Sequence, residues 1–361
     1  MTIGVPKEIM NGENRVGMTP KGVFWATGNG HSVLVEQNAG SGSSLEDAQY
    51  VASGAEIVSS AAEVWARADL IVKIKQPIPS EYPYFRDGLI LFSFLHLAAN
   101  RELTWALMEA GMTAIAYETI EEEDGELPLL APMSEVAGRM ATQVGARMLE
   151  TGSGGRGILL GGVAGVGPAH VVVLGGGVVG INAARVALGM GAQVTIMDVV
   201  PRRMRYLEEV LHGRFTTLHS YSVNVQPAVR DADLVIGCVL VPGAPAPTIV
   251  EERTVMEMKP GSAIVDVAVD QGGCVETIHV TSHDNPTYVL HGVVHYGVPN
   301  MPGAVPHTAT WALTAVSAPF VLDLAGLGLD AAVSSDRVFA RGVNVRAGKV
   351  VHPVVAKSLC R

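Results

Sequence analysis

Three glycines in the middle of the chain have the spacing G-x-G-x-x-G: Gly175, Gly177 and Gly180. They follow the apolar run 171–174, which is typical of a buried parallel strand. In a dinucleotide-binding turn, the first glycine makes the tight turn, the second lets the backbone approach the pyrophosphate, and the third lets helix and strand pack closely. The helix that follows would offer N–H groups and a positive dipole end to the phosphates. The spacing therefore predicts a dinucleotide site.

An acidic residue follows where such a site needs one. Asp198 ends a second apolar run at 194–197. A carboxylate at this position can accept hydrogen bonds from the ribose hydroxyls and disfavours a 2′-phosphate, which predicts NAD rather than NADP. Arg202 and Arg203 come soon after Asp198 and could pair with a 2′-phosphate, so the choice between the two cofactors stays open on these residues alone.

Three basic side chains in the first third of the chain could bind a small anion or move protons. Lys75 and His96 close the apolar runs LIVKIK and LILFSFLH, and Arg15 ends the polar loop after the first apolar run. Ligands of open α/β sheets bind beyond the carboxyl ends of the strands, so the positions of Lys75 and His96 favour a role in ligand binding or catalysis. A solvated lysine and a hydrogen-bonded, half-buried histidine are the alternatives.

The elements that must position these groups alternate between strand and helix. We expect strands at 2–5, 32–36, 55–58, 70–75, 89–96, 113–118, 171–174, 194–197, 232–240 and 262–269. Helices are expected at about 20–27, 46–52, between 58 and 70, and at 101–109, 134–150 and 181–190, the first beginning at Thr19-Pro20. This alternation predicts an α/β protein of two Rossmann-like, doubly wound domains with a cleft between them. The uncharged stretch 157–184 contains many glycines and Pro168, so we expect loop, strand, turn and helix there rather than a membrane span.

The domain organisation is expected to be discontinuous. A long helix at 134–150 leads into the nucleotide unit, and the proline-rich segment 299–308 has the composition of a hinge. The last segment, at 309–361, is expected to return to the N-terminal domain. We therefore predict a substrate domain at 1–127 plus 307–361 and an NAD-binding Rossmann domain at 128–306.

Composition narrows the class further. The chain has 361 residues and a formal net charge of −10, with no basic block, so nucleic acid and anionic membrane surfaces are unexpected partners. The first ten residues lack the pattern of a secretory signal. The three cysteines, Cys238, Cys274 and Cys360, are far apart and show no metal-binding spacing. We expect reduced thiols, a cytoplasmic location and no bound metal.

Long blocks of this sequence resemble the alanine dehydrogenase family, which is related to the nucleotide-binding subunit of proton-translocating transhydrogenase. The blocks are GVPKEI, NRVGMTP, VKIKQP, LFSFLHLAAN, LPLLAPMSEVAGRMA, GGVAGVGPAHVVVLGGGVVG, DLVIGCVLVPGAPAP, IVDVAVDQGGC and VPNMPGAVPHTAT. They extend from position 4 to position 310. Pro299 departs from the family pattern, which usually has alanine before Asn-Met-Pro.

The resemblance implies an oxidoreductase with NAD as cofactor, commonly a homohexamer, that converts L-alanine reversibly to pyruvate and ammonium. Carried over motif by motif, Arg15 and Lys75 would bind the substrate, and His96 and Asp270 would be the catalytic acid/base groups. Residues from several segments would bind NAD: Ser134, Gly175, Gly177, Val178, Val179, Gly180, Asp198, Arg203, Ser220, Val239, Leu240, Val267, Asp270, Asn300 and Met301.

Two other functions are compatible with part of this pattern. A transhydrogenase-type subunit would pass hydride between two nucleotides, but the matching loop of that branch lacks an aspartate at the position of Asp270. A non-catalytic NAD-binding regulator would be expected to lose Lys75, His96 or Asp270. All three residues are present, which favours the amino-acid dehydrogenase.

Overall fold

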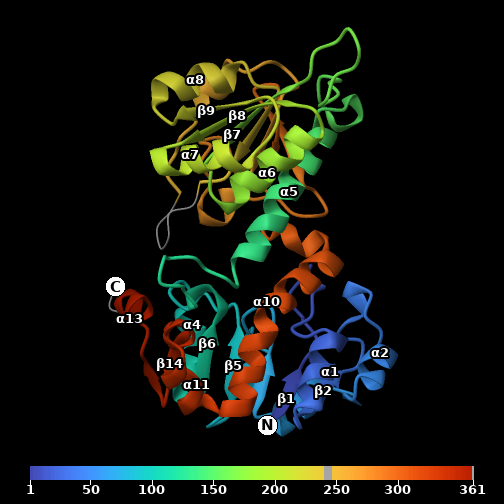
Figure 1. Ribbon diagram of the computed structural model, residues 1–361, viewed down its shortest axis with the longest axis vertical. Coiled ribbons are helices and arrows are strands. Elements are labelled where there is room, and N and C mark those ends of the chain that lie inside the picture. Colours follow the sequence, from blue (N-terminus) through green and yellow to red (C-terminus); the bar gives the residue numbers. More distant parts are fainter. Residues whose placement is uncertain (240–245, 360–361) are drawn as a thin grey trace. The chain divides into compact units, whose positions relative to one another are not determined.

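The computed structural model describes residues 1–239 and 246–359 of the chain. The chain forms two compact units, and the second is inserted into the first. Unit 1 combines Met1–Met133 with Val305–Arg361, and unit 2 is Ser134–Ala304. Each unit is built on its own sheet (Figure 1).

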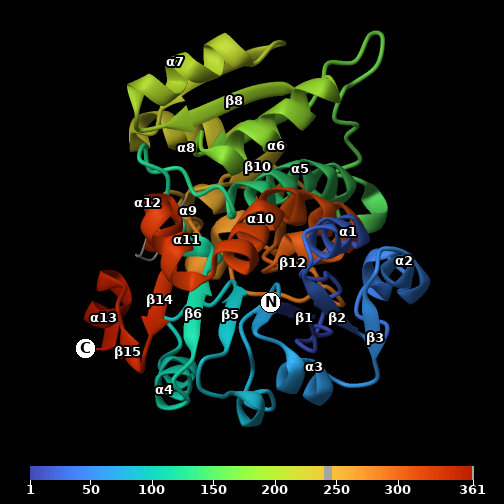
Figure 2. The same cartoon turned by 60° about the horizontal axis from the view of Figure 1, so that its bottom comes forward.

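The sheet of unit 1 has the strand order β15-β14-β6-β5-β4-β1-β2-β3. The six strands from β6 to β3 are parallel, and β14 and β15 add an antiparallel hairpin beside β6 (Figure 2). The strands are β1 (Thr2–Val5), β2 (Ser32–Glu36), β3 (Glu56–Val58), β4 (Leu70–Val72), β5 (Ile90–Ser93), β6 (Thr113–Ala116), β14 (Val343–Arg346) and β15 (Lys349–Val350).

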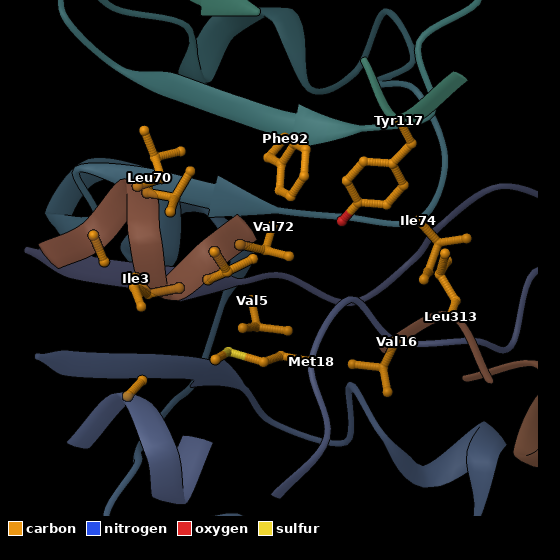
Figure 3. Packing of buried hydrophobic residues seen from close by; sticks show 14 of the residues in the cluster. Ile3, Val5, Val16, Met18, Leu70, Val72, Ile74, Phe92, Tyr117 and Leu313 are labelled. Carbon is orange, nitrogen blue, oxygen red and sulfur yellow. The ribbon is translucent and has the colours of Figure 1, made fainter. Parts of the chain in front are cut away.

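Helices cover both faces of this sheet. One core contains Ile3, Val5, Val72, Phe92 and Tyr117, and side chains of α10 such as Leu313 belong to it (Figure 3). A second core, which includes residues of α3 and α4, covers the other face. The helices of unit 1 are α1 (Pro20–Gly28), α2 (Asp47–Ala52), α3 (Ala61–Arg67), α4 (Arg101–Glu109), α10 (Pro306–Leu327), α11 (Leu329–Ser335), α12 (Arg337–Arg341) and α13 (Pro353–Leu359), and α5 (Ala131–Met148) begins in it.

The sheet of unit 2 has the order β12-β13-β11-β10-β7-β8-β9, in which only the edge strand β12 is antiparallel. Its strands are β7 (His170–Leu174), β8 (Gln193–Asp198), β9 (Phe215–His219), β10 (Leu234–Gly237), β11 (Ala263–Asp266), β12 (Thr287–Leu290) and β13 (Val293–Tyr296). Its helices are most of α5, α6 (Val178–Gly189), α7 (Pro201–Val210), α8 (Ser222–Arg230) and α9 (Glu252–Met256). Both sheets are thus doubly wound, as the alternating pattern predicts.

Local signals explain where several helices begin. Thr19 caps α1 by accepting the N–H of Gly22, and Pro20 occupies the first turn, where its missing N–H costs nothing. Asn100 caps α4 by accepting the N–H of Leu103. The uncharged stretch 157–184 is not one helix: it contains loop, β7, the glycine turn and the start of α6.

Several boundaries differ from the sequence expectation. Strands β4 and β5 end at Val72 and Ser93, three residues before Lys75 and His96, and β10 ends at Gly237. Strand β11 ends at Asp266, and Asp270 lies in a short 3₁₀ helix, Val267–Gln271, rather than just beyond a longer strand. Helix α5 begins at Ala131, and the β14–β15 hairpin was not expected at all.

Helix α10 is the one helix in the described part of the chain that is long and apolar enough to cross a membrane. Nine of its residues are buried, among them Leu313, Val321 and Leu324, and they pack into the core of unit 1. Its apolar composition is therefore explained by its place in the core of unit 1, since a helix that is buried in a globular core is apolar.

Candidate active site and cofactor site

The glycine turn between β7 and α6 has the backbone geometry that its spacing predicts. Gly175 has φ +100°, a conformation that side chains rarely tolerate. A Cβ on Gly180 would collide with the carbonyl oxygen of Gly175, so only glycine lets the helix begin this close to the strand. A Cβ on Gly177 would meet nothing within 4 Å, which leaves its outer side open for a ligand.

The N-terminus of α6 offers donors to such a ligand. Gly177 is its N-cap and provides no side-chain cap. The first N–H groups of a helix lack intrahelical partners and, with the helix dipole, favour an anion. The first residues of this helix are Val178 and Val179, both named by the family resemblance.

Asp198, at the end of β8, is tied to the glycine turn. Its carboxylate accepts the N–H of Gly176 at 2.7 Å and the N–H of Val200 at 2.8 Å. An ionised carboxylate has about four acceptor positions, so these two bonds fix its orientation and leave capacity for ribose hydroxyls. Arg203, in the first turn of α7, is exposed, and its side chain lies near Gly176.

The remaining cofactor candidates of unit 2 come from several segments. Ser134 lies in the first turns of α5, Ser220 follows β9 and donates its N–H to the carbonyl of Asp198, and Val239 follows β10. Asn300 has φ +52°, a left-handed conformation that asparagine tolerates better than most residues, and Met301 is buried behind it. Leu240 lies outside the described residues.

A buried carboxylate closes the loop that carries Asp270. Asp266 accepts the N–H groups of Ala268 at 2.9 Å, Cys274 at 2.7 Å and Val275 at 3.1 Å. Burial raises the pKa of Asp266, and these backbone donors oppose the rise. Asp270, in the same loop, is exposed. Cys238 and Cys274 are buried free thiols beneath this loop.

Arg15 is buried in unit 1 together with an acidic partner. Its Nε donates to Oε1 of Glu13 at 2.7 Å and its Nη2 to Oε2 at 2.5 Å, a two-pronged ion pair in which Arg15 is only 2% exposed. Its Nη1 also contacts the Met133 sulfur at 3.1 Å. Burial alone would raise the pKa of Glu13, but the hydrogen bonds and charge of Arg15 outweigh it and lower that pKa. The charge of Lys75 acts on Glu13 in the same direction.

Lys75 follows a second buried ion cluster. Nζ of Lys73 lies 3.3 Å from Oε2 of Glu8 and 2.9 Å from Oε1 of Glu81, with all three side chains almost fully buried. Oε1 of Glu8 accepts the backbone N–H groups of Ile74 at 2.6 Å and of Lys75 at 3.3 Å. Burial raises the pKa of Glu8, and the charge of Lys73 opposes the rise. These bonds hold the backbone just beyond the end of β4, at Ile74 and Lys75.

His96 has a half-exposed ring and an unusual backbone. Its φ is +51°, a left-handed conformation that is costly for a residue with a Cβ. Its backbone N–H donates to Oε1 of Glu118 at 2.6 Å, and Leu95 donates to Oε2 of the same carboxylate at 3.2 Å. Nδ1 of His96 lies 3.9 Å from that carboxylate, and the ring is parallel to Phe94.

Unit 1 brings the three basic groups to one edge of its sheet. The N–H of Phe94 donates to the carbonyl of Ile74 at 3.2 Å, so the segments that carry Lys75 and His96 run side by side. The sequence interpretation did not assign Glu8, Glu13, Glu118 or Asp266 to the site. The signal for Glu118 was available, because it follows the strand TAIA as His96 follows its own strand.

Two doubly wound α/β units, one with a glycine turn and a carboxylate at the end of the next strand, define a Rossmann-fold protein of the dinucleotide-binding type. Family models match both parts of the chain: the alanine dehydrogenase/PNT N-terminal domain over residues 4–137 and the alanine dehydrogenase/PNT C-terminal domain over residues 141–353. The chain belongs to the alanine dehydrogenase/PNT family.

Known proteins resemble the whole chain. An alanine dehydrogenase of Methanococcus maripaludis is 53% identical over 359 residues, which cover 99% of this chain and 96% of that protein. A solved L-alanine dehydrogenase superposes with a TM-score of 0.97 at 54% identity, over 100% of this chain and 99% of the other. A solved transhydrogenase from Sinorhizobium meliloti has a TM-score of 0.84 at 26% identity, over 98% and 99% of the two chains.

Proposed function

We propose that this chain is an NAD-dependent L-alanine dehydrogenase, which catalyses the reversible oxidative deamination of L-alanine to pyruvate and ammonium. The observation that carries the proposal is the full-length similarity to alanine dehydrogenases, at about twice the identity found for the transhydrogenase structure. Asp270, which the matching loop of the transhydrogenase branch lacks, is present in this chain and favours the dehydrogenase activity.

The residues of unit 2 fit NAD. The open side of Gly177 and the uncapped N-terminus of α6 suit the pyrophosphate, and the carboxylate of Asp198 suits the ribose hydroxyls. Ser134, Arg203, Ser220, Val239, Leu240, Val267, Asn300 and Met301 complete the proposed set. When bound, NAD supplies the redox chemistry by accepting a hydride from the Cα of alanine. Unit 2 is accordingly proposed as the cofactor domain and unit 1 as the substrate domain.

Arg15 and Lys75 are proposed to hold the substrate carboxylate. A planar guanidinium and a compact ammonium are both suited to a small carboxylate. Glu13 already occupies Nε and Nη2 of Arg15 in the structure.

His96 and Asp270 are proposed to move protons. Loss of hydride from alanine leaves an imine, to which water adds, and the resulting carbinolamine loses ammonia. Addition of water needs a proton acceptor and loss of ammonia needs a donor, and an imidazole and a carboxylate can fill both roles near neutral pH. Asp266 accepts the backbone N–H groups that close the loop, so the structure of the loop does not depend on the carboxylate of Asp270. We therefore propose a chemical role for Asp270.

We further propose a cytoplasmic enzyme that assembles as a homohexamer, as its family commonly does, with no nucleic-acid or membrane partner. The net charge of −10 and the absence of a basic block support the last point. Size-exclusion chromatography with light scattering would test the hexamer directly, and a monomer at working concentration would contradict it.

The proposed activity is tested by following NADH appearance with NAD and a panel of L-amino acids, and NADH loss with pyruvate and ammonium. We expect alanine to be the best amino-acid substrate and NAD to be preferred over NADP. Hydride exchange between NADH and an NADP analogue, without any effect of alanine, would instead indicate the transhydrogenase activity. Tight NADH binding with neither reaction would indicate a regulator.

A further inference from the structure

Three glutamates of unit 1 share one structural relationship with the three basic groups of the proposed site. Each accepts the backbone N–H of a basic residue: Glu8 that of Lys75, Glu13 that of Arg15 and Glu118 that of His96. Glu8 and Glu13 come from the loop after β1, whereas Glu118 follows β6. Glu13 also makes a close, two-pronged side-chain ion pair with Arg15, whereas Nδ1 of His96 lies 3.9 Å from Glu118 and the backbone bonds are the shorter contacts there. Glu118 and Glu8 are therefore the two cases in which a role through the backbone can be tested.

Glu118 contacts the backbone of His96 where its conformation is unfavourable, at φ +51°. A left-handed residue with a Cβ costs of order 1–3 kcal/mol and persists only where its surroundings enforce it. The carboxylate of Glu118 accepts two consecutive N–H groups, those of Leu95 and His96, at the point where β5 has ended. Glu118 is only 17% exposed, so water competes weakly for these donors. The direction of the His96 ring follows from this turn.

Glu8 holds the backbone at Lys75 by the same kind of contact. Its Oε1 accepts the N–H groups of Ile74 and Lys75. Its Oε2 is held by Lys73, whose ammonium is in turn held by Glu81. Lys73 points into unit 1, where it is 1% exposed, while Lys75 is only partly buried. Lys73 therefore anchors the carboxylate of Glu8, which fixes the backbone from which Lys75 projects, whereas Glu81 contacts Lys73 without a bond to this stretch of backbone.

We propose that Glu118 and Glu8 are positioning residues for the dehydrogenase reaction: Glu118 orients His96 and Glu8 orients Lys75, each through backbone N–H groups. The proposal rests on the function proposed above. It assigns the two glutamates different kinetic effects, because His96 is placed in proton transfer and Lys75 in substrate binding. A shared role in stability alone would affect both variants in the same way.

The test compares Glu118→Ala, Glu118→Gln, Glu8→Gln and the matched control Glu81→Gln in steady-state pyruvate reduction. Glu118→Ala should lower kcat by on the order of 10–100-fold, as expected for a misplaced catalytic group, with the KM for pyruvate nearly unchanged. Glu118→Gln keeps one acceptor oxygen and should recover part of the loss. Glu8→Gln should raise the KM for pyruvate more than it lowers kcat. All variants should bind NADH like the wild type.

Glu81→Gln removes a carboxylate that is as buried as Glu8 and contacts the same Lys73, but its backbone bond goes to Ile78. It should lower the melting temperature without raising the KM. The proposal is wrong if Glu81→Gln raises the KM as much as Glu8→Gln does, or if Glu118→Ala changes kcat and KM together in proportion to its loss of stability.

Hydrogen exchange supplies a readout that does not depend on activity. In the wild type, the amides of His96 and Lys75 should be protected, and Glu118→Ala should speed exchange in a peptide covering 94–97 while leaving 73–76 unchanged. Equal exchange in both proteins would overturn the positioning role of Glu118. Wild-type protein that shows this protection but no alanine-dependent NADH formation would contradict the proposed function and leave the backbone contacts established.

Discussion

The two sheets of this protein have the same parallel strand order and yet present different chemistry at their carboxyl edges. In unit 1 the order is β3-β2-β1-β4-β5-β6, and in unit 2 it is β9-β8-β7-β10-β11-β13. The edge of unit 1 carries Arg15, Lys75 and His96, each with a glutamate bonded to its backbone. The edge of unit 2 carries glycines, uncapped helix donors and the carboxylate of Asp198.

Part of this difference comes from the loop after the first strand of each sheet. In unit 2 that loop is a tight glycine turn, and we propose that its backbone meets the ligand. In unit 1 it is the long charged loop after β1, which supplies Glu8, Glu13 and Arg15. Two sheets of the same fold can therefore have different functions, because the loops at their edges carry different residues. Substitutions in each unit should separate the proposed role of unit 1 in substrate binding from that of unit 2 in cofactor binding.

The largest effect is expected from Asp270→Asn. This variant should keep its fold and its NADH affinity but lose kcat by roughly 10²–10⁴, the range for a general acid/base. Because Asp266 closes the loop, the loss should not come from unfolding. Turnover kinetics and NADH fluorescence titration on the same preparation give both quantities. Near-normal turnover would refute the catalytic assignment.

Substitutions in unit 1 should separate substrate binding from cofactor binding. Lys75→Met should weaken the handling of pyruvate and alanine by about 2–5 kcal/mol, the cost of removing one member of a desolvated charge pair, with NADH affinity nearly intact. Arg15→Ala should act in the same direction and also lower the melting temperature, because it leaves Glu13 buried without its main partner. A parallel collapse of NADH affinity in Lys75→Met would contradict the carboxylate-binding role.

Two glycines of unit 2 form a matched pair. Gly180→Ala should destabilise unit 2 by about 1–3 kcal/mol, because its Cβ would meet the Gly175 carbonyl in a packed region. Gly177→Ala meets nothing within 4 Å and should leave the melting temperature nearly unchanged, yet it should weaken NADH binding. Thermal melts and NADH titrations distinguish the two. Unchanged NADH affinity in Gly177→Ala would mean that the pyrophosphate does not approach this turn.

The smallest effect is expected from Asp198→Ala, which should narrow the preference for NAD over NADP by about 1–3 kcal/mol, the usual contribution of hydrogen bonds to a charged group. The ratio of kcat/KM for the two cofactors measures this directly. Arg202 and Arg203 follow Asp198 closely, so the variant leaves cations near the ribose position. Equal efficiency of the wild type with both cofactors would overturn the role given to Asp198.

Much of the fold could be predicted because its signals are local. The turn at Gly175 needs φ +100°, and its glycine can be recognised without knowing any neighbour. Thr19 and Pro20 mark the start of α1 for the same reason, since cap and first turn are made by adjacent residues. Apolar runs bounded by turn residues predicted most of the parallel strands, apart from their exact ends, but not β9 or β13.

The ends of β4 and β5 could not be predicted, because residues distant in the sequence decide them. Glu8 takes the N–H groups of Ile74 and Lys75, and Glu118 takes those of Leu95 and His96. An apolar pattern continues through these positions, so the sequence favoured longer strands. The β14–β15 hairpin was missed for a related reason: besides pairing with β15, β14 pairs with β6, more than two hundred positions earlier in the chain.

The sequence by itself determined which residues can do chemistry here: the glycine turn, Asp198, and the basic and acidic side chains that follow apolar strands. Spacing and residue type are sufficient for that, because strand, turn and helix in a βαβ unit are contiguous. Only the tertiary structure decided how those side chains are held. Glu118 reaches His96, and Glu8 reaches Lys75, because neighbouring parallel strands bring their carboxyl ends to one edge of the sheet, and no local pattern records which carboxylate will accept which N–H.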